Sequence, residues 1–288
     1  MTRSLVAALA VLIVGAASPA FAQVSFVGDW SGRYHEDQPD RVPGEEPGDF
    51  SGIPINEAAR RFGDAWDVAR HSVLEHQCAP YTLPYMFFGP NQFRIWQQVN
   101  PDTQELVAIE MHLGTYQQRR TIWLDGRPHP SEFAEHLWQG FSTGVWENGM
   151  LKVTTTHMKQ AFLQRNGIPS SPYAVMTEYF IRHGQLLMMI SQVDDPIYLE
   201  EPMVRTQTWR WNPNQREPAI GQVEIAEELP DLKPGDVPHY PLGTRHPEYA
   251  DANGLPFDAT LGGKETLYPE YVDRLKEMMR ASEKKGSR

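Results

Sequence analysis

The 288-residue sequence contains one cysteine, Cys78, so no disulfide can form within the chain. The fold must therefore be held together by its core and not by crosslinks. Basic residues are also fewer than acidic ones: the sequence has 26 Lys and Arg and 37 Asp and Glu, which give a net charge of −11. Such a chain repels nucleic-acid phosphates and anionic membrane surfaces, so neither is an expected partner.

Long apolar runs are absent apart from one at the N-terminus. Arg3 is the only charged residue before Gln23, Leu5–Val14 is almost continuously apolar, and Ala20-Phe21-Ala22 places small residues where a signal peptidase cleaves. The run is short for a bilayer-spanning helix, which makes an uncleaved anchor the less favoured alternative. We expect residues 1–22 to be a signal peptide. The mature protein would then be periplasmic or secreted, without membrane insertion after cleavage.

Several motifs of common enzyme classes are also missing. The sequence has no H-E-x-x-H metal motif, no Walker phosphate loop, no G-x-G-x-x-G dinucleotide motif and no C-x-x-C pair. Zincins, P-loop nucleotide enzymes, dinucleotide-dependent enzymes and c-type cytochromes are therefore not expected. We expect no bound cofactor.

What the sequence does contain, from Phe93 onward, is short runs of strand-like residues separated by turns. Asn148-Gly149 is the strongest hairpin signal, because both residues tolerate the positive φ of a type I′ turn, and His183-Gly184 marks a second hairpin. The expected strands are Val24–Tyr34, Phe93–Val99, Leu106–Leu113, Gln118–Leu124, Phe141–Trp146, Leu151–Met158, Ala174–Ile181, Leu186–Val193 and Met203–Trp211.

Two helices are expected outside this run of strands. Asn56–His71 has a helical pattern with Asn56 as its N-cap. Its apolar face would comprise Ala58, Phe62, Ala65, Trp66 and Ala69. After Pro213 the chain becomes rich in proline and acidic residues, and it ends in a helix near Tyr268–Ser282. We expect residues 23–213 to form one β domain and residues 214–288 to form an irregular tail that wraps the outside of the sheet.

We expect the sheet to close on itself, because an open sheet would leave two edge strands unpaired. An open meander of about eight strands would expose unpaired edge strands, and closing it into a barrel removes them. We expect a mainly β fold, in which Phe93–Trp211 is one antiparallel meander, closed or nearly closed, with Asn56–His71 packed against it. A two-sheet sandwich is the alternative. Gly28-Asp29-Trp30 resembles the Gly-x-Trp start of lipocalin-type barrels.

Longer segments are similar to a group of secreted bacterial β-rich proteins of unassigned function. The segments are RTIWLDGRPHP (Arg120–Pro130), GFSTGVWENGMLKVTTT (Gly140–Thr156), DDPIYLEEP (Asp194–Pro202) and VPHYPLG (Val237–Gly243). The resemblance covers most of the mature chain and implies an extracytoplasmic location. It implies no activity.

Strand alternation groups several polar side chains with apolar ones on single strand faces. A mainly apolar face with a few polar groups is typical of a ligand-binding interior. The candidates for such a cavity are Glu110, His112, His157, Glu178, Arg182, Arg205 and Trp209. In particular, we expect His112, His157 and Glu178 to share one cavity, with Arg182 or Arg205 as the charge partner. The alternative is that these side chains face water outside the barrel.

The loop Asp125–His136 holds a second set of candidates. His129 could act as a general acid or base, with Asp125 or Glu178 orienting it. Glu132 and His136, four residues apart, could bind a metal together with His129, although solvated loop residues are the favoured interpretation. A third candidate is Cys78 with His76, for which a small buried hydrophobe is the favoured interpretation.

Two hypotheses for the function follow from these candidates. The first is an extracytoplasmic barrel that binds a small, largely apolar or aromatic molecule. The second is a cofactor-independent isomerase, lyase or hydrolase in the same barrel, with His112, His129 or His157 as the acid or base. Both require a small-molecule partner in the barrel interior.

Overall fold

The computed structural model describes residues 24–33, 46–72, 79–87, 92–114, 117–215, 233 and 235–286. The expected signal peptide, His76 and Cys78 lie outside these residues. Within the described ranges, no helix combines the length and the apolar character needed to cross a bilayer.

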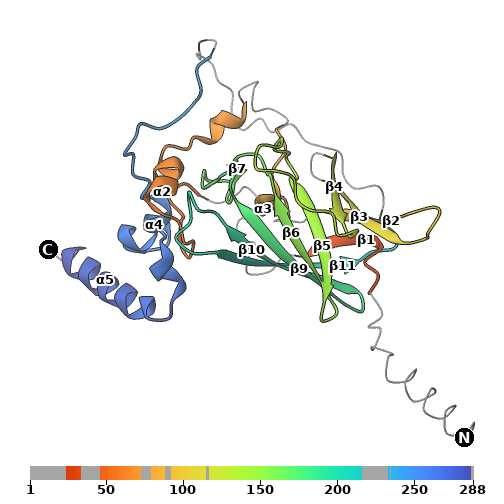
Figure 1. Ribbon diagram of the computed structural model, residues 1–288. Helices are drawn as coiled ribbons and strands as arrows, with labels where there is room; N and C mark the ends of the chain where they lie inside the picture. Colours follow the sequence, from red (N-terminus) through yellow and green to blue (C-terminus); the bar gives the residue numbers. More distant parts are fainter. Residues whose placement is uncertain are drawn as a thin grey trace, which may run out of the picture.

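The core of the molecule is a closed barrel of nine strands in the order β1-β11-β10-β9-β6-β5-β4-β3-β2 (Figure 1). The strands are β1 (Gly28–Arg33), β2 (Phe93–Val99), β3 (Leu106–Leu113), β4 (Gln118–Trp123), β5 (Phe141–Glu147), β6 (Met150–Thr156), β9 (Val175–His183), β10 (Leu186–Asp194) and β11 (Met203–Trp211). Two short strands, β7 (Ala161–Phe162) and β8 (Pro169–Ser170), pair separately. The barrel prediction is confirmed.

The barrel differs from the predicted topology at one pair of strands, because its number of strands is odd. A closed ring in which every strand runs opposite to both neighbours needs an even number of strands. This ring has nine, so one neighbouring pair must be parallel, and that pair is β4 and β5. The prediction of a wholly antiparallel sheet is wrong at this pair, because residues 124–140 carry the chain back before β5 begins.

A tight turn at Asn148-Gly149 joins β5 to β6, as predicted. Asn148 and Gly149 both have positive φ, 51° and 81°, as a type I′ turn requires. Their flanking residues Glu147 and Met150 pair directly. The second predicted hairpin also forms, and its loop is Gly184-Gln185, because His183 pairs with Leu186.

The predicted N-terminal helix is shorter than expected and buries a different face. Helix α2 (Glu57–Asp64) begins at the predicted cap, where the Asn56 side chain accepts a hydrogen bond from the Ala59 N–H. Its buried residues are Ala59 and Gly63, whereas Phe62 is 48% exposed. The reason is a close approach: a Cβ at residue 63 would lie 2.6 Å from the Phe50 ring. The apolar pattern across 56–71 therefore does not describe a single helical face.

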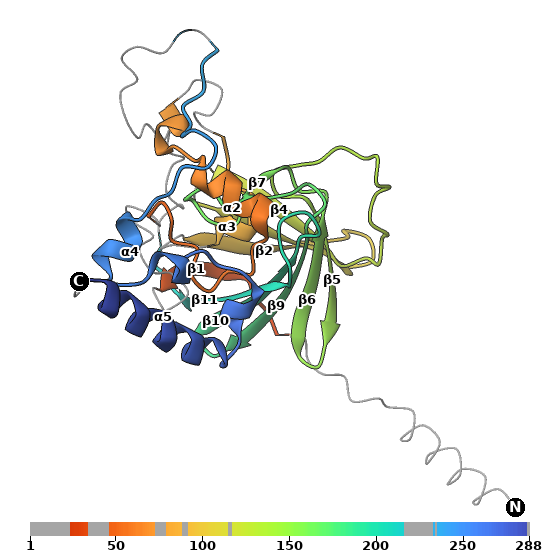
Figure 2. The same ribbon diagram turned by 90° about the vertical axis from the view of Figure 1, so that its left-hand side faces the viewer.

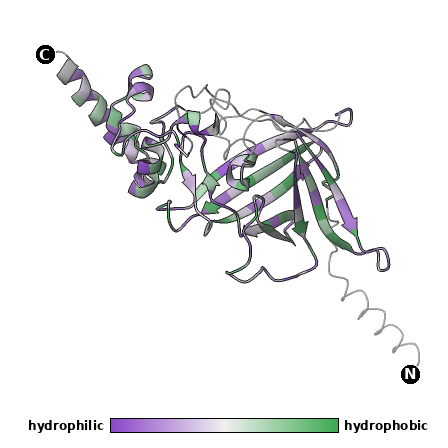
Figure 3. Ribbon diagram, turned by 90° about the horizontal axis from the view of Figure 1, so that it is seen from above, coloured by the Kyte–Doolittle hydropathy of each residue, from purple (hydrophilic) through white to green (hydrophobic). Residues whose placement is uncertain are grey.

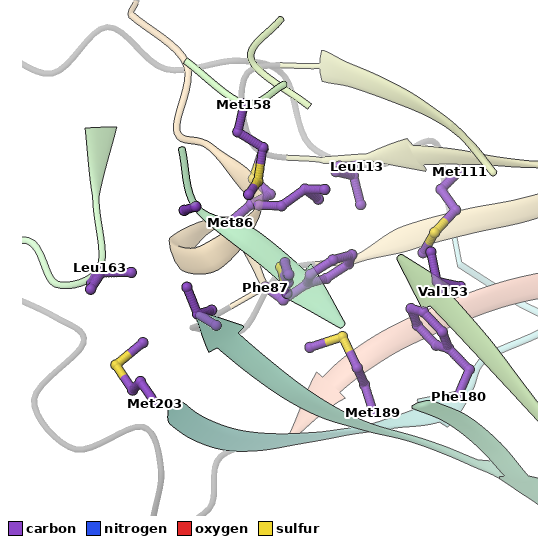
Figure 4. Close-up of a cluster of buried hydrophobic side chains, with 14 of the residues drawn as sticks. Met86, Phe87, Met111, Leu113, Val153, Met158, Leu163, Phe180, Met189 and Met203 are labelled. Carbon is purple, nitrogen blue, oxygen red and sulfur yellow. The ribbon is translucent and has the colours of Figure 1, made fainter. Parts of the chain in front are cut away.

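Both ends of the barrel are covered by side chains. Where the chain enters β1, the buried Trp30 donates to the Phe26 carbonyl and the Arg182 guanidinium lies over its ring. Phe26 in turn stacks on Trp146. At the opposite end, every residue of 81–87 is buried, including the short helix α3 (Leu83–Met86). Figure 4 shows Met86 and Phe87 of this segment among interior side chains of the strands.

The tail contacts elements near the α3 end of the barrel. His246 Nε2 donates to the Asp64 carbonyl, Tyr240 N–H to Ala65, and Gly263 N–H to Ile53. Figures 1 and 2 show α2, α4 (Glu248–Ala252) and α5 (Tyr271–Gly286) gathered on one side of the barrel, away from the β5–β6 hairpin. The predicted C-terminal helix is α5. In Figure 3, hydrophobic and hydrophilic residues alternate along the barrel strands.

Interior packing gives the first testable prediction. Met189 is fully buried in the barrel, whereas its neighbour Met188 on the same strand is 36% exposed. We expect Met189→Ala to lower the free energy of unfolding by about 2–5 kcal/mol, because it leaves a void in the core. Met188→Ala should change it by less than about 0.5 kcal/mol. Urea unfolding of both variants measures the difference, and equal losses would contradict the interior position of Met189.

Candidate functional site

An ion pair crosses the barrel interior between β4 and β9. Arg120 and Glu178 are 1% and 0% exposed. Arg120 Nη1 donates to Glu178 Oε1 over 2.8 Å, and Nη2 donates to Oε2, so the carboxylate is held by two parallel hydrogen bonds. A two-pronged pairing of this kind is among the stronger side-chain interactions and fixes both groups in orientation.

Two hydroxyl groups complete the surroundings of the guanidinium. Arg120 Nε donates to Ser142 Oγ over 3.1 Å, and Nη2 donates to Thr155 Oγ1 over 2.9 Å. The two hydroxyls are 2.8 Å apart and also bond to each other. Every nitrogen of the guanidinium is therefore in use. Burying an ion pair without such hydrogen bonds would be costly, and this network offsets that cost.

Strand alternation explains how these four residues meet. On β4, Arg120 is buried between two exposed or half-buried neighbours, Arg119 and Thr121. Ser142 on β5 pairs with Thr155 on β6. Glu178 on β9 pairs with Val153 on β6. None of Arg120, Ser142 and Thr155 was selected from the sequence as a site residue, although alternation places Thr155 on the same face as Leu151 and Val153. The signal was available, because Arg120 shares its strand face with the apolar Ile122.

Gly140–Gly144 (G-F-S-T-G) matches the spacing G-x-S-x-G. That motif marks a nucleophilic serine when it forms a sharp turn between a strand and a helix. Here Ser142 lies within β5, and its hydroxyl bonds to Arg120 and Thr155. The geometry is that of a strand residue facing the interior, so the motif does not identify a nucleophile.

Most of the interior around the ion pair is apolar, with many thioether and aromatic groups, and the buried polar residues Ser191 and Gln207 lie opposite Glu178 and Met189. Met111 lies opposite Arg120, and Met189 lies opposite Phe180. The labelled side chains in Figure 4 are Met86, Phe87, Met111, Leu113, Val153, Met158, Leu163, Phe180, Met189 and Met203. Methionine side chains are flexible and polarisable, so they adapt to the shape of what they contact.

Trp209 of β11 lies in this interior, as predicted. It is fully buried, and its ring contacts Phe93 and Phe87, with centroids 4.9 and 5.6 Å away. Its Nε1 has no hydrogen-bond partner among the described residues. A buried N–H without an acceptor is unfavourable by about 1–3 kcal/mol. Trp146 Nε1 on β5 is a second such indole nitrogen among the described residues.

Arg182 and Arg205 do not serve as the charge partner of Glu178. Arg182 donates to the carbonyls of Gly184 and Ser25 at the Trp30 end of the barrel. Arg205 donates to the Leu163 carbonyl. The predicted partnership is therefore wrong, because each of these side chains extends from a strand end towards a neighbouring loop while Arg120 reaches the centre.

His112 and Glu110 lie on the outer face of β3, so the predicted cavity of His112, His157 and Glu178 is wrong. In the register, His112 lies opposite Arg119, which is exposed, whereas Met111 lies opposite the buried Arg120. His112 Nε2 bonds to Gln117 Oε1, and Glu110 accepts from Thr121 Oγ1. Alternation correctly separated the two faces, but the apolar face is the one that lines the interior.

His157 also lies outside the interior, for a different reason. It follows the end of β6 and has φ of +58°, so it leaves the alternating pattern of the strand. Its Nε2 bonds to the Ser131 carbonyl and its Nδ1 to Thr156 Oγ1, while its ring lies 5.2 Å from that of His136. His157 thus anchors the loop between β4 and β5 to the outside of the barrel.

His129 belongs to the same outer cluster and continues a chain of hydrogen bonds. Its Nδ1 forms a hydrogen bond with Thr156 Oγ1 and its Nε2 forms one with Thr143 Oγ1, and both donor–acceptor distances are 2.8 Å. Because the Ser131 carbonyl only accepts, neutral His157 must donate from Nε2 and accept at Nδ1. Thr156 then donates to His157 and accepts from His129, and Thr143 donates to His129. All protons in the chain point in one direction.

The remaining loop candidates have local partners. Asp125 pairs with Arg127, whose hydrogen bonds lower the pKa of the carboxyl, so Asp125 does not orient His129. His136 Nδ1 bonds to the Met158 carbonyl, and Glu132 is exposed. No group of three or more metal-ligating side chains occurs in the part of the chain that the structure describes. The arrangement gives no support to the metal interpretation of this loop.

The ion pair generates a prediction about stability. Arg120→Met leaves the Glu178 carboxylate buried without its partner, and we expect the free energy of unfolding to fall by about 3–5 kcal/mol. The double variant Arg120→Met, Glu178→Met removes both charges and should recover much of this loss. Arg119→Met, on the exposed face of the same strand, is the matched control. Denaturant unfolding of the four proteins tests the pair, and a double variant no more stable than Arg120→Met would contradict it.

The outer histidine chain generates a prediction about pH. Burial, reinforced by His157, lowers the pKa of His129 below its usual value of about 6.5. The unfolded chain therefore binds more protons than the folded one as the pH falls through that value, and stability must fall with it. We expect wild type to lose more stability from about pH 8 to about pH 5 than His129→Gln does. The exposed His183→Gln should behave as wild type, and parallel curves for all three proteins would contradict the prediction.

Comparisons with protein-family models, with curated proteins and with solved structures find no match to this chain. The resemblance of its segments to secreted bacterial proteins thus stays a prediction. The function has to be argued from the barrel interior itself.

Proposed function

We propose that this protein binds a small, largely apolar or aromatic molecule in the interior of its barrel, outside the cytoplasm. The interior offers adaptable methionines and aromatic rings around a few fixed polar groups. Such a composition is typical of small-molecule sites, in which apolar contacts give affinity and a few polar groups give orientation.

The observation that carries this proposal is the Arg120–Glu178 pair with its two hydroxyl partners. A buried ion pair is often no more stable than well-packed apolar side chains of similar volume. Its position in the middle of a mainly apolar barrel is therefore poorly explained by stability alone. A rigid polar feature against which a ligand is oriented is the function we assign to it.

The acid–base enzyme hypothesis finds less support in the arrangement of the described residues. The enzyme predicted from the sequence uses a histidine or a free carboxylate beside the substrate as its acid or base. His112, His129 and His157 lie outside the barrel wall, and Glu178 is committed to Arg120. Binding without turnover is therefore the function we favour. The signal-peptide pattern of residues 1–22 supports the extracytoplasmic location.

An uncharged fluorescent probe tests the proposal. We expect N-phenyl-1-naphthylamine to bind the purified protein saturably with one site per chain. Met189→Trp fills part of the interior and should weaken this binding by about tenfold or more, with circular dichroism confirming that the variant folds. Met188→Trp, on the outer face of the same strand, should leave it unchanged. Absence of saturable binding to wild type, or equal effects of the two variants, would overturn the proposal.

A further inference from the structure

Phe87 reaches the barrel interior from the segment 81–87 and not from a barrel strand. It follows helix α3 directly and is 1% exposed. Figure 4 shows its ring in the middle of the interior cluster, near Phe180 and Met189. The segment therefore fills interior volume that the strands leave open.

The Phe87 ring lies between the polar features of the interior. Its centroid is 5.9 Å from Arg120 Cζ on one side and 5.6 Å from the Trp209 ring on another. The rings of Phe93 and Phe180 complete its surroundings, at 6.1 and 6.5 Å. A flat aromatic ring is thus the shape that this part of the barrel accommodates.

Trp209 adds a chemical requirement to that shape. Its buried Nε1–H lacks an acceptor among the described residues. The Phe87 side chain has no acceptor oxygen to offer. A ring of similar size that carried a carbonyl or ether oxygen could satisfy this donor, which the described residues leave unsatisfied.

The charges of the interior add a third requirement. Arg120 and Glu178 neutralise each other, and every guanidinium nitrogen already has a partner. An ionic ligand would lose its hydration here without gaining a counter-charge, which is strongly unfavourable. The interior therefore selects for molecules without net charge.

We propose that the ligand of the barrel is an uncharged aromatic molecule with a hydrogen-bond acceptor, which takes the place of the Phe87 ring and accepts from Trp209 Nε1. This inference rests on the proposed function and specifies its ligand class. Binding displaces Phe87, so the segment 81–87 occupies the site in the unbound protein.

The test removes the Phe87 ring and supplies rings from solution. Phe87→Ala should unfold at a lower temperature than wild type and regain stability with added ligands, because a ligand that binds only the folded state stabilises it by mass action. Acetophenone, ethylbenzene and benzoate have similar shapes but differ in acceptor and charge. We expect acetophenone to bind roughly threefold to tenfold more tightly than ethylbenzene, the usual effect of one hydrogen bond, and benzoate to give no stabilisation.

Two further variants test whether the preference for acetophenone depends on the Trp209 indole N–H and on the barrel interior. Phe87→Ala, Trp209→Phe removes the indole donor and should bind acetophenone and ethylbenzene equally. Phe133→Ala removes an 89% exposed ring outside the barrel interior and should respond to the three compounds as wild type does. If Phe87→Ala does not fold alone, the smaller deletion Phe87→Leu and the recovery of folding by acetophenone provide the same comparison.

The outcomes separate this inference from the proposed function. Equal binding of acetophenone and ethylbenzene to Phe87→Ala, or tight binding of benzoate, would overturn the inference even if wild type binds the fluorescent probe. Failure of wild type to bind that probe would overturn the proposed function, even if Phe87→Ala prefers acetophenone. A preference that disappears with Trp209→Phe supports the assigned ligand class.

Discussion

Closure of nine strands into one ring is the constraint on which the rest of this structure depends. Since nine strands cannot alternate in direction all the way round, one neighbouring pair must run parallel. In this barrel the pair is β4 and β5, and a long connection joins them. That connection carries His129 and His136 onto the outer face of the barrel and brings Gln139 to the α3 segment, where it bonds to the Tyr81 carbonyl. The positions of the outer histidine chain and of one end of the barrel thus follow from strand parity.

The strands themselves could be predicted from the sequence with close limits. The predicted limits of β2, β3 and β11 agree with the structure, because turn residues bracket each run of strand residues. The α2 region could be predicted less well. Its cap at Asn56 is local chemistry, but its buried face depends on the tertiary approach of Phe50 to Gly63.

The site was less predictable than the fold, for three physical reasons. Alternation shows which side chains share a face but not which face lines the interior, so Glu110 and His112 were placed inside. A positive φ at His157 breaks the alternation where the strand ends. Arg120 was missed because an arginine is seldom buried unless a partner accepts its charge, and that partner, Glu178, is far away in sequence.

The thioether groups of this barrel have a consequence for its chemistry in an oxidising environment. Oxidation of methionine to the sulfoxide converts a flexible apolar side chain into a polar one. Met188 and Met279 are 36% and 39% exposed, whereas Met111, Met176 and Met189 are essentially inaccessible. A dissolved oxidant therefore meets the outer methionines first, and the interior keeps its apolar lining for as long as the barrel stays closed.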